Sequence, residues 1–239
     1  MPEKESAESG NTESGSRRGR IHNAEGARFA LLNAAEEVFA ENGFDGARVD
    51  EIARRAGYNK SLLFQYFGDK LALYSEVIRQ ADEQTRLKQD EALSTMLDAA
   101  TADQTDKIRK MLAGYVGWYF DYLVEHPHIQ RIYMWEMAEG WQTFSKILVQ
   151  RDFDDLDQFA PVLARLQVAG MMRSGINPLL QLSPALFMCS LYLATLPLYK
   201  ALIPGEDFTS PAEMALARSF VIEFIVNGLL IPPPETRPA

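Results

Sequence analysis

The sequence predicts an all-α fold of about nine helices, and three observations support this prediction. Apolar residues recur at helical spacing through most of the 239 residues. No convincing alternation of apolar and polar residues, the pattern typical of β-strands, is present. Glycine and proline fall mainly between the periodic segments, where helices would end. The expected helices lie near residues 24–42, 49–56, 60–66, 70–98, 104–124, 128–150, 155–172, 179–202 and 211–230.

We expect three parts along the chain. Residues 1–23 contain no apolar run, so they cannot be a signal peptide, and we predict a disordered N-terminal arm. Residues 24–70 are predicted to form a small three-helix domain, and residues 71–239 a larger helical domain. The last helix has a clear start, because Ser210 and Glu213 form a capping box around a proline at the first helical position.

Composition excludes several protein classes. An apolar share of 47% is too high for a disordered chain, and the single cysteine, Cys189, excludes a disulfide scaffold and fits a reducing, cytoplasmic compartment. The net charge of −9 argues against a general nucleic-acid coat. However, the acids are concentrated in residues 1–16 and 80–239, whereas residues 17–79 carry ten cations and nine acids. The overall charge therefore says little about whether this chain binds DNA.

The two short helices of the small domain have the spacing of a helix-turn-helix motif. Ala53 is small where crossing helices must approach, Gly57 follows where the chain reverses, and Leu63 is the apolar position of the second helix. Asn59 can cap that second helix. An ordinary corner of a helical bundle would mix acids and cations at random, whereas residues 59–66 hold no acid. The acid-free helix start therefore favours contact with a phosphate-lined groove.

With these features, residues 28–70 resemble the DNA-binding domain of the TetR family of bacterial transcription regulators. The length of the chain and its helical remainder also fit that family. The residues that carry the resemblance are Ala34, Ala35, Phe39, Gly43, Phe44, Ile52, Ala53, Ala56, Gly57, Lys60, Leu63, Tyr66, Phe67 and Lys70.

The resemblance implies that the helix beginning at Lys60 enters the major groove of a double-stranded DNA operator. It implies phosphate contacts for Lys60 and Tyr66, and a place close to the DNA backbone for Lys70. The basic cluster Arg17–Arg20 has two interpretations that stay open, a minor-groove contact and a solvated charge cluster on a disordered tail.

Base-edge contacts are implied for Ser61, Leu62 and Gln65. Leu62 replaces a small polar residue common in the family and favours a thymine methyl group, while Gln65 could pair with adenine. Arg48 and Phe64 replace the usual Thr and Tyr, so a helix cap and a phenolic hydroxyl are lost. The predicted DNA-binding residues are Arg48, Asn59, Lys60, Ser61, Leu62, Phe64, Gln65, Tyr66 and Lys70.

The last two predicted helices are apolar around most of their circumference, in the segments 184–203 and 214–231. Such helices are buried in their own chain or packed against another chain. Two per subunit could form the four-helix interface of a two-fold homodimer, and a monomer core is the alternative. Prolines and polar residues interrupt the uncharged stretch 174–199, so we expect residues 184–199 to be buried in protein and not to cross a membrane.

The resemblance also implies that the larger domain binds a small molecule. Its middle helices are rich in aromatic residues and Met, which suits a mostly apolar cavity, although core packing is the simpler account of any single residue. Arg131 could pair with a ligand carboxylate. The predicted ligand-binding residues are Trp118, Tyr119, Tyr122, Arg131, Trp135, Met171, Phe187 and Tyr192.

No catalytic, metal or cofactor motif emerges from the sequence. His126 and His128 flank a proline and do not share a helix face, and no third ligand cluster accompanies them. We therefore predict no enzyme, no metal and no cofactor. The expected function is a cytoplasmic transcriptional repressor that a small apolar or amphipathic effector releases from DNA. A dimeric DNA-binding protein without a ligand is the main alternative, and a helical enzyme or carrier without DNA binding is a weaker one.

Overall fold

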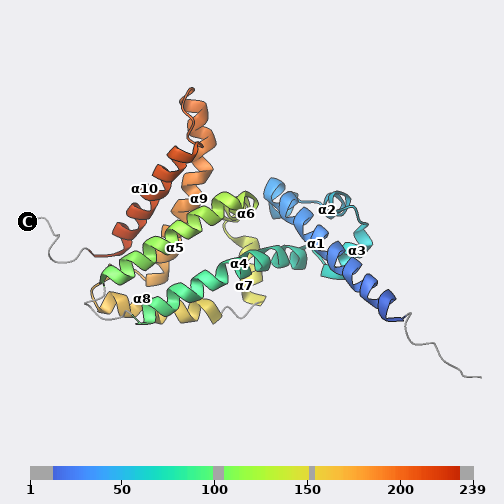
Figure 1. Cartoon of the computed structure of the whole chain (residues 1–239), viewed down its shortest axis with the longest axis horizontal. Coiled ribbons are helices and arrows are strands. Elements are labelled where there is room, and N and C mark those ends of the chain that lie inside the picture. The colour runs from blue at the N-terminus through green and yellow to red at the C-terminus, as the bar shows by residue number, and fades with distance from the viewer. Residues whose placement is uncertain (1–12, 99–104, 151–153, 232–239) are drawn as a thin grey trace, which may run out of the picture. The chain divides into compact units, whose positions relative to one another are not determined.

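The computed structural model describes residues 13–98, 105–150 and 154–231, and side chains within 24–95, 105–149 and 160–231. Over these residues the chain is helical throughout, with no strand and one isolated β-bridge between Met172 and Leu230 (Figure 1), which confirms the predicted fold class. The helices are α1 (Glu13–Gly46), α2 (Val49–Ala56), α3 (Lys60–Phe67), α4 (Lys70–Asp98), α5 (Thr105–Glu125), α6 (Pro127–Ala138), α7 (Gln142–Gln150), α8 (Asp154–Val168), α9 (Pro178–Leu202) and α10 (Pro211–Leu229).

Two helical boundaries differ from the prediction. The single helix expected over 128–150 is α6 followed by α7, because Gly140 (φ 70°) and Trp141 (φ 62°) both adopt left-handed backbone conformations. The Trp141 N–H instead donates to the carbonyl of Glu136 at 2.7 Å. At the other end, α1 begins at Glu13, so the part of the expected arm from 13 to 23 is helical backbone. Residues 1–12, and the side chains of the Arg17–Arg20 cluster, lie outside the described residues and side chains.

The first compact unit contains α1, α2, α3 and the start of α4. Its core uses one apolar face of α1, where Leu31, Val38 and Phe39 are fully buried. Gly43 interrupts α1 with φ 67° and ψ 179°, which ends the amphipathic part of the helix where the sequence predicted it. Buried side chains in α4 complete the core, among them Tyr74, whose ring packs edge-on against Phe39 at 4.7 Å.

The boundary between the two compact units falls after Arg79, although we expected it after Lys70. The difference arises because the first turns of α4 bury Tyr74, Val77 and Ile78. An ion pair between Arg28 of α1 and Glu76 of α4 also holds this part of α4 to the N-terminal unit. The helix α4 then continues into the second unit.

The second unit is a bundle in which α5 packs against α6, α9 and α10, while α8 packs on α9. One face of α5 is buried along its length, with Ile108, Val116 and Phe120 almost completely inaccessible. The segment after α8 fixes the end of α10, because the Arg173 side chain donates from Nε to the Gly228 carbonyl at 2.9 Å. Ser210 caps the start of α10 by accepting from the Glu213 N–H, as the capping box predicted.

Residues 184–199, expected to be buried in protein, are mostly exposed within the single chain, so of the two alternatives a monomer core does not account for them. In α9 the buried residues are Cys189 and Ser190, and in its most apolar 18-residue window only 11% is buried. Among the described residues, α9 is the one helix long and apolar enough to cross a membrane by length and composition. However, α9 packs against α5, α8 and α10 as part of a helical bundle, and an apolar helix face that its own chain leaves exposed is typical of packing against a second protein chain.

Candidate nucleic-acid interface and effector region

The turn between α2 and α3 has the geometry of a helix-turn-helix motif. Gly57 ends α2 in a left-handed conformation (φ 76°, ψ 22°), and the next N–H, from Tyr58, donates to the Ala53 carbonyl at 2.9 Å. Asn59 then caps α3, because its side-chain oxygen accepts from the Leu62 N–H at 2.8 Å. The turn and the cap therefore follow from the residue types that the sequence analysis singled out.

The helix α3 divides into a buried and an exposed face. Leu63 and Phe67 are buried in the core of the first unit, while Leu62 and Tyr66 are half-buried. The remaining predicted contact residues of α3 are exposed. These exposed residues are Lys60, Ser61, Phe64 and Gln65. Ser61 and Gln65, four residues apart, share one face of the helix.

The predicted phosphate contacts carry their own intramolecular interactions. The Lys60 ammonium lies 3.0 Å from the Asp50 carboxylate and 5.8 Å from the centre of the Phe64 ring. The Lys70 ammonium lies 4.6 Å from the centre of the Phe44 ring and donates to the Asp45 carbonyl at 3.3 Å.

Arg48 is exposed at the start of α2, and its side chain makes no capping hydrogen bond there. This agrees with the loss of a cap that the sequence indicated.

A network of ion pairs holds α2 against α1, and the sequence analysis did not find it. Arg55 of α2 donates to both oxygens of Glu41 in α1, and its Nε donates to Glu51 at 2.8 Å. Arg54 donates to Glu51 as well. Hydrogen bonds from Arg54 and Arg55 lower the pKa of Glu51 to about 2. The sequence did contain a signal for this network. Glu37 and Glu41 lie on the outer face of α1, and α2 ends in two arginines that could pair with them.

Two separate aromatic clusters contain most of the predicted ligand-binding residues. The first runs along α5, where Trp118 stacks on Tyr122 at 5.6 Å and Tyr122 stacks on His126 at 4.2 Å. The neighbouring Tyr119 is largely buried, and this burial raises the pKa of its phenol well above the usual range. Tyr192 of α9 lies near Phe120 of α5, with ring centres 6.4 Å apart.

The second cluster joins α6, α7 and α9. The Phe187 ring lies 5.2 Å from Trp141 and 6.4 Å from Tyr133. Phe144 contacts the same two partners, Trp141 and Tyr133. These four half-buried rings bring Phe187 together with residues that the sequence analysis did not select for the site.

Arg131 and Trp135 do not join either cluster. Both are exposed on α6, where they and Met134 line a surface hollow of about 250 Å³. Met171 is buried beside the end of α10, where its carbonyl accepts from the Ile231 N–H. The proposed pairing of Arg131 with a ligand carboxylate stays a prediction, and its place is this surface hollow and not an aromatic cluster.

Two polar side chains of α6 are buried near the aromatic clusters, Gln130 and Glu136, whereas the predicted contact Arg131 is exposed. Gln130 of α6 donates to the Ser190 carbonyl of α9 at 3.1 Å, inside the bundle. Glu136 is almost completely buried and accepts from the Phe144 N–H at 3.0 Å, which supports the start of α7. The sequence alone could not show that Glu136 points into the bundle.

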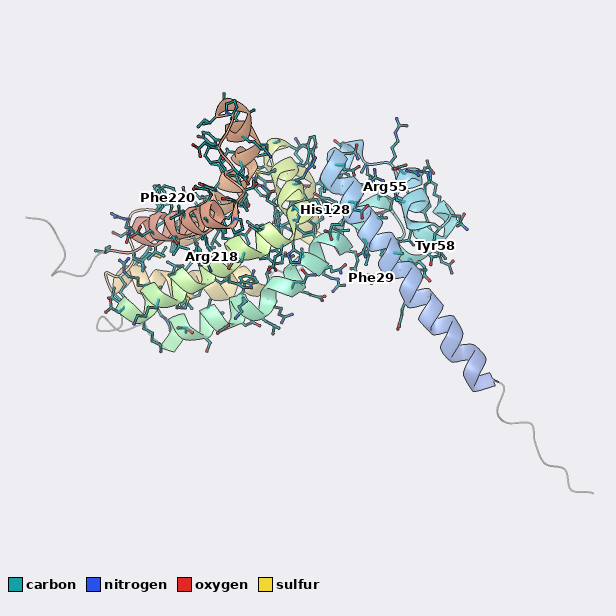
Figure 2. The ribbon with its side chains drawn as sticks, turned by 45° about the horizontal axis from the view of Figure 1, so that its top comes forward. Phe29, Arg55, Tyr58, His128, Arg218 and Phe220 are labelled. Carbon is teal, nitrogen blue, oxygen red and sulfur yellow. The ribbon has the colours of Figure 1, made fainter. Side chains whose placement is uncertain are left out.

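A further hollow of about 290 Å³ lies between α5 and α10. It is lined by residues that include Phe120, Met214 and Arg218 (Arg218 is labelled in Figure 2), and the Arg218 side chain donates to Asp121, which also lines the hollow, at 2.8 Å. Neither hollow is lined by the predicted aromatic residues as a set. Among the side chains that the structure describes, no group of three His, Cys, Asp or Glu residues is placed to hold a metal ion.

Comparison with known proteins agrees with both units. Residues 31–77 match the model of bacterial regulatory proteins of the tetR family, and residues 105–225 match the tetracyclin repressor-like C-terminal domain. The transcriptional activator FasR of Mycolicibacterium smegmatis is 37% identical over 47% of this chain and 47% of its own length. The transcriptional repressor NicS of Pseudomonas putida is 32% identical over 47% of this chain and 49% of its own length. The chain thus spans about half the length of the curated relatives it matches.

Solved structures share the fold at low sequence identity. A TetR family transcription regulator from Marinobacter aquaeolei superposes with a TM-score of 0.57 at 19% identity, covering 89% of this chain and 100% of the other. FadR from Bacillus subtilis, solved in complex with stearoyl-CoA, gives a TM-score of 0.54 at 20% identity, covering 84% and 98%. The C-terminal match alone spans half of the sequence, and it follows a helix-turn-helix unit in the same order as in these proteins. The chain belongs to the tetR family of bacterial regulatory proteins.

Proposed function

We propose that this protein is a homodimeric, DNA-binding transcriptional repressor whose hold on its operator is weakened by a small apolar or amphipathic effector. One observation carries the DNA-binding part of the proposal. The exposed start of α3 is capped by Asn59, carries Lys60, Ser61 and Gln65, and holds no acid. Such a surface offers hydrogen-bond donors and acceptors to base edges and a cation to phosphate.

The homodimer is supported by the apolar side chains that α9 and α10 leave exposed. On α10, Leu216, Phe220 and Phe224 are each more than half exposed and recur every four residues. They therefore form one stripe on the helix. Leu191, Leu198 and Leu202 form a similar stripe on α9. A second copy of the chain would cover both helices and give the two-fold symmetry that a palindromic operator requires.

Effector binding is supported by the aromatic clusters of α5, α6, α7 and α9, whose rings are buried or half-buried between helices of the second unit. The α5 cluster also reaches α4, because the Tyr122 hydroxyl donates to Gln84 at 3.4 Å. A ligand could open this region only by preferring a conformation in which the clusters part. The solved complex of FadR with stearoyl-CoA shows that the same fold can hold an amphipathic ligand in that protein.

A ligand-independent DNA-binding protein is the second candidate. It is favoured by the contacts between rings within the clusters, and by two hollows of the second unit, neither of which is lined by the predicted aromatic set. In either case the protein would act in the cytoplasm on double-stranded DNA, without catalysis or a cofactor.

The DNA-binding proposal is tested by selecting a duplex from a random pool with the full chain and measuring its affinity by fluorescence anisotropy. Lys60→Ala and Tyr66→Phe should weaken binding, and Lys60→Ala should reduce the dependence on salt by about one phosphate contact per subunit. Lys107→Ala, which removes an exposed cation from α5 in the other unit, is the matched control. Unchanged affinity and unchanged salt dependence in both α3 variants would refute the proposal.

A further inference from the structure

We propose that Asp50 limits the DNA affinity of this protein by holding Lys60 in an ion pair that must open before Lys60 can reach a phosphate. This inference rests on the proposed DNA-binding function and adds an affinity-limiting residue to it. Asp50 lies in the first turn of α2 and Lys60 is the first residue of α3, and their charged atoms are 3.0 Å apart.

Lys60 interacts with two groups. Its ammonium contacts the Asp50 carboxylate and also lies 5.8 Å from the centre of the Phe64 ring, an attractive cation–π arrangement. The side chain of Lys60 is about half exposed (48%) and that of Asp50 is more exposed (74%). The pair therefore lies on the surface of α2 and α3, where an incoming phosphate can compete for Lys60.

The two acids of the first turn of α2 have different partners. Glu51 accepts hydrogen bonds from Arg54 and Arg55, so its charge is used within the network that fastens α2 to α1. Asp50 instead pairs with a cation of the reading helix. Its carboxylate is placed where a phosphate oxygen would otherwise meet Lys60, so Asp50 acts on DNA affinity through Lys60 and not by touching DNA.

The energetic consequence is modest and measurable. An exposed ion pair of this kind corresponds to a change of about 2- to 5-fold in an equilibrium constant. A dimer contains two such pairs, one in each DNA-binding unit, so the combined change in DNA affinity would be about 4- to 25-fold. The effect should be the same on any sequence, because phosphate contacts carry no sequence information.

The test is a double-mutant cycle in the full chain, with Asp50→Asn, Lys60→Ala and the double variant. Affinity for a random-sequence duplex of about 30 base pairs, long enough for two successive major grooves, is measured at several salt concentrations. Asp50→Asn should tighten binding by about 4- to 25-fold, and adding it to Lys60→Ala should give no gain. Glu25→Gln removes the same charge from an exposed position of α1 and should not reproduce the gain.

Each other outcome is informative. A gain from Asp50→Asn that persists in the Lys60→Ala background would show simple repulsion between Asp50 and DNA and would overturn the inference. If Lys60→Ala weakens binding but Asp50→Asn leaves it unchanged, the inference fails while the proposed function stands. If Lys60→Ala has no effect, the assignment of α3 itself fails. Asp50→Glu, which keeps the charge, should retain the affinity of the unmodified protein, and melting temperatures identify any variant that is not folded.

Discussion

The guanidinium of Arg55 in α2 donates to both carboxylate oxygens of Glu41 in α1, at 2.8 and 2.6 Å (Figure 2 shows Arg55). This two-point contact sets the angle between the first two helices of the DNA-binding unit, since bidentate pairing fixes the orientation of both groups. Arg55 also lies 3.8 Å from Glu37, the residue one turn before Glu41. Since α3 follows α2 directly, we expect the pair to position α3, the proposed recognition helix, without touching DNA itself.

We expect Arg55→Met to reduce DNA affinity several-fold, because α2 and α3 would lose a fixed orientation relative to α1. Arg54→Met is the matched control. Arg54 bonds to Glu51 within its own helix and is largely exposed (71%), so its loss should change affinity less than about 2-fold. Anisotropy titrations of both variants give the comparison. Equal losses of DNA affinity in the two variants would mean that the removed positive charge, and not the Arg55–Glu41 contact, determines the affinity.

The turn glycine offers a prediction about stability. Gly57→Ala should lower the free energy of unfolding by about 1 kcal/mol, because alanine is strained at φ 76°. A Cβ at Gly57 would meet nothing within 4 Å, so no clash contributes. Gly26→Ala is the control, since Gly26 is equally open but lies within α1, and it should stabilise by about 0.5–1 kcal/mol. Urea denaturation measures both, and a loss at both positions would contradict the argument from backbone strain.

Lowering the pH should remove the stabilisation that the ionised Glu76 carboxylate gives to the fold. Hydrogen bonds from Arg79 and, to a smaller extent, Arg28 lower the pKa of Glu76 to about 2, from 4.5 in the absence of these partners. A lowered pKa in the folded state stabilises the fold fully above pH 4.5, and that contribution is lost as the pH falls toward 2. The stability difference between the unmodified protein and Glu76→Gln, measured by urea denaturation, should therefore shrink below pH 4.5. Arg79→Met should show the same trend, and a difference that stays constant with pH would contradict it.

The apolar stripe of α10 gives a prediction about assembly. Phe220→Asp should dissociate the dimer or weaken it strongly, because the variant places a charge in a face that only a second chain can bury. Phe29→Asp in α1 is a close control, since Phe29 is 58% exposed and Phe220 is 57% exposed (Figure 2). Sedimentation equilibrium should show a lower mass for the Phe220 variant alone. A monomeric unmodified protein, or a dimer that survives Phe220→Asp, would contradict this interface.

The features predicted correctly from sequence are those that short stretches of chain determine. Gly43 and Gly57 end helices through backbone freedom, and Asn59 and Ser210 cap helices with their own side chains. The break between α6 and α7 was missed, because Trp141 adopts φ 62° without being glycine. Its ring contacts with Phe144 and Phe187, from α7 and α9, are tertiary interactions that no local pattern reveals.

Faces of helices inside a bundle were the least predictable part. Arg131 and Gln130 are adjacent in the sequence, yet Arg131 is exposed whereas Gln130 is buried against Ser190 of α9. The positive charge of Arg131 made it the more plausible contact for a ligand carboxylate. However, which side chain points into the bundle depends on how α6 packs against its neighbours. Which chain covers the apolar face of α9 was also left open by the sequence, since hydropathy cannot distinguish burial within one chain from burial by a second chain.

The central claim is that two copies of α3 read one DNA site together, and hydroxyl-radical footprinting tests it most directly. The full chain is bound to a duplex that it has selected from a random pool, and the cleavage pattern of each strand is recorded. We expect two protected stretches, related by two-fold symmetry and centred about 10 base pairs or a multiple of that apart, and both weaker in Lys60→Ala at the same protein concentration. A single protected stretch, or protection that Lys60→Ala leaves unchanged, would contradict the central claim.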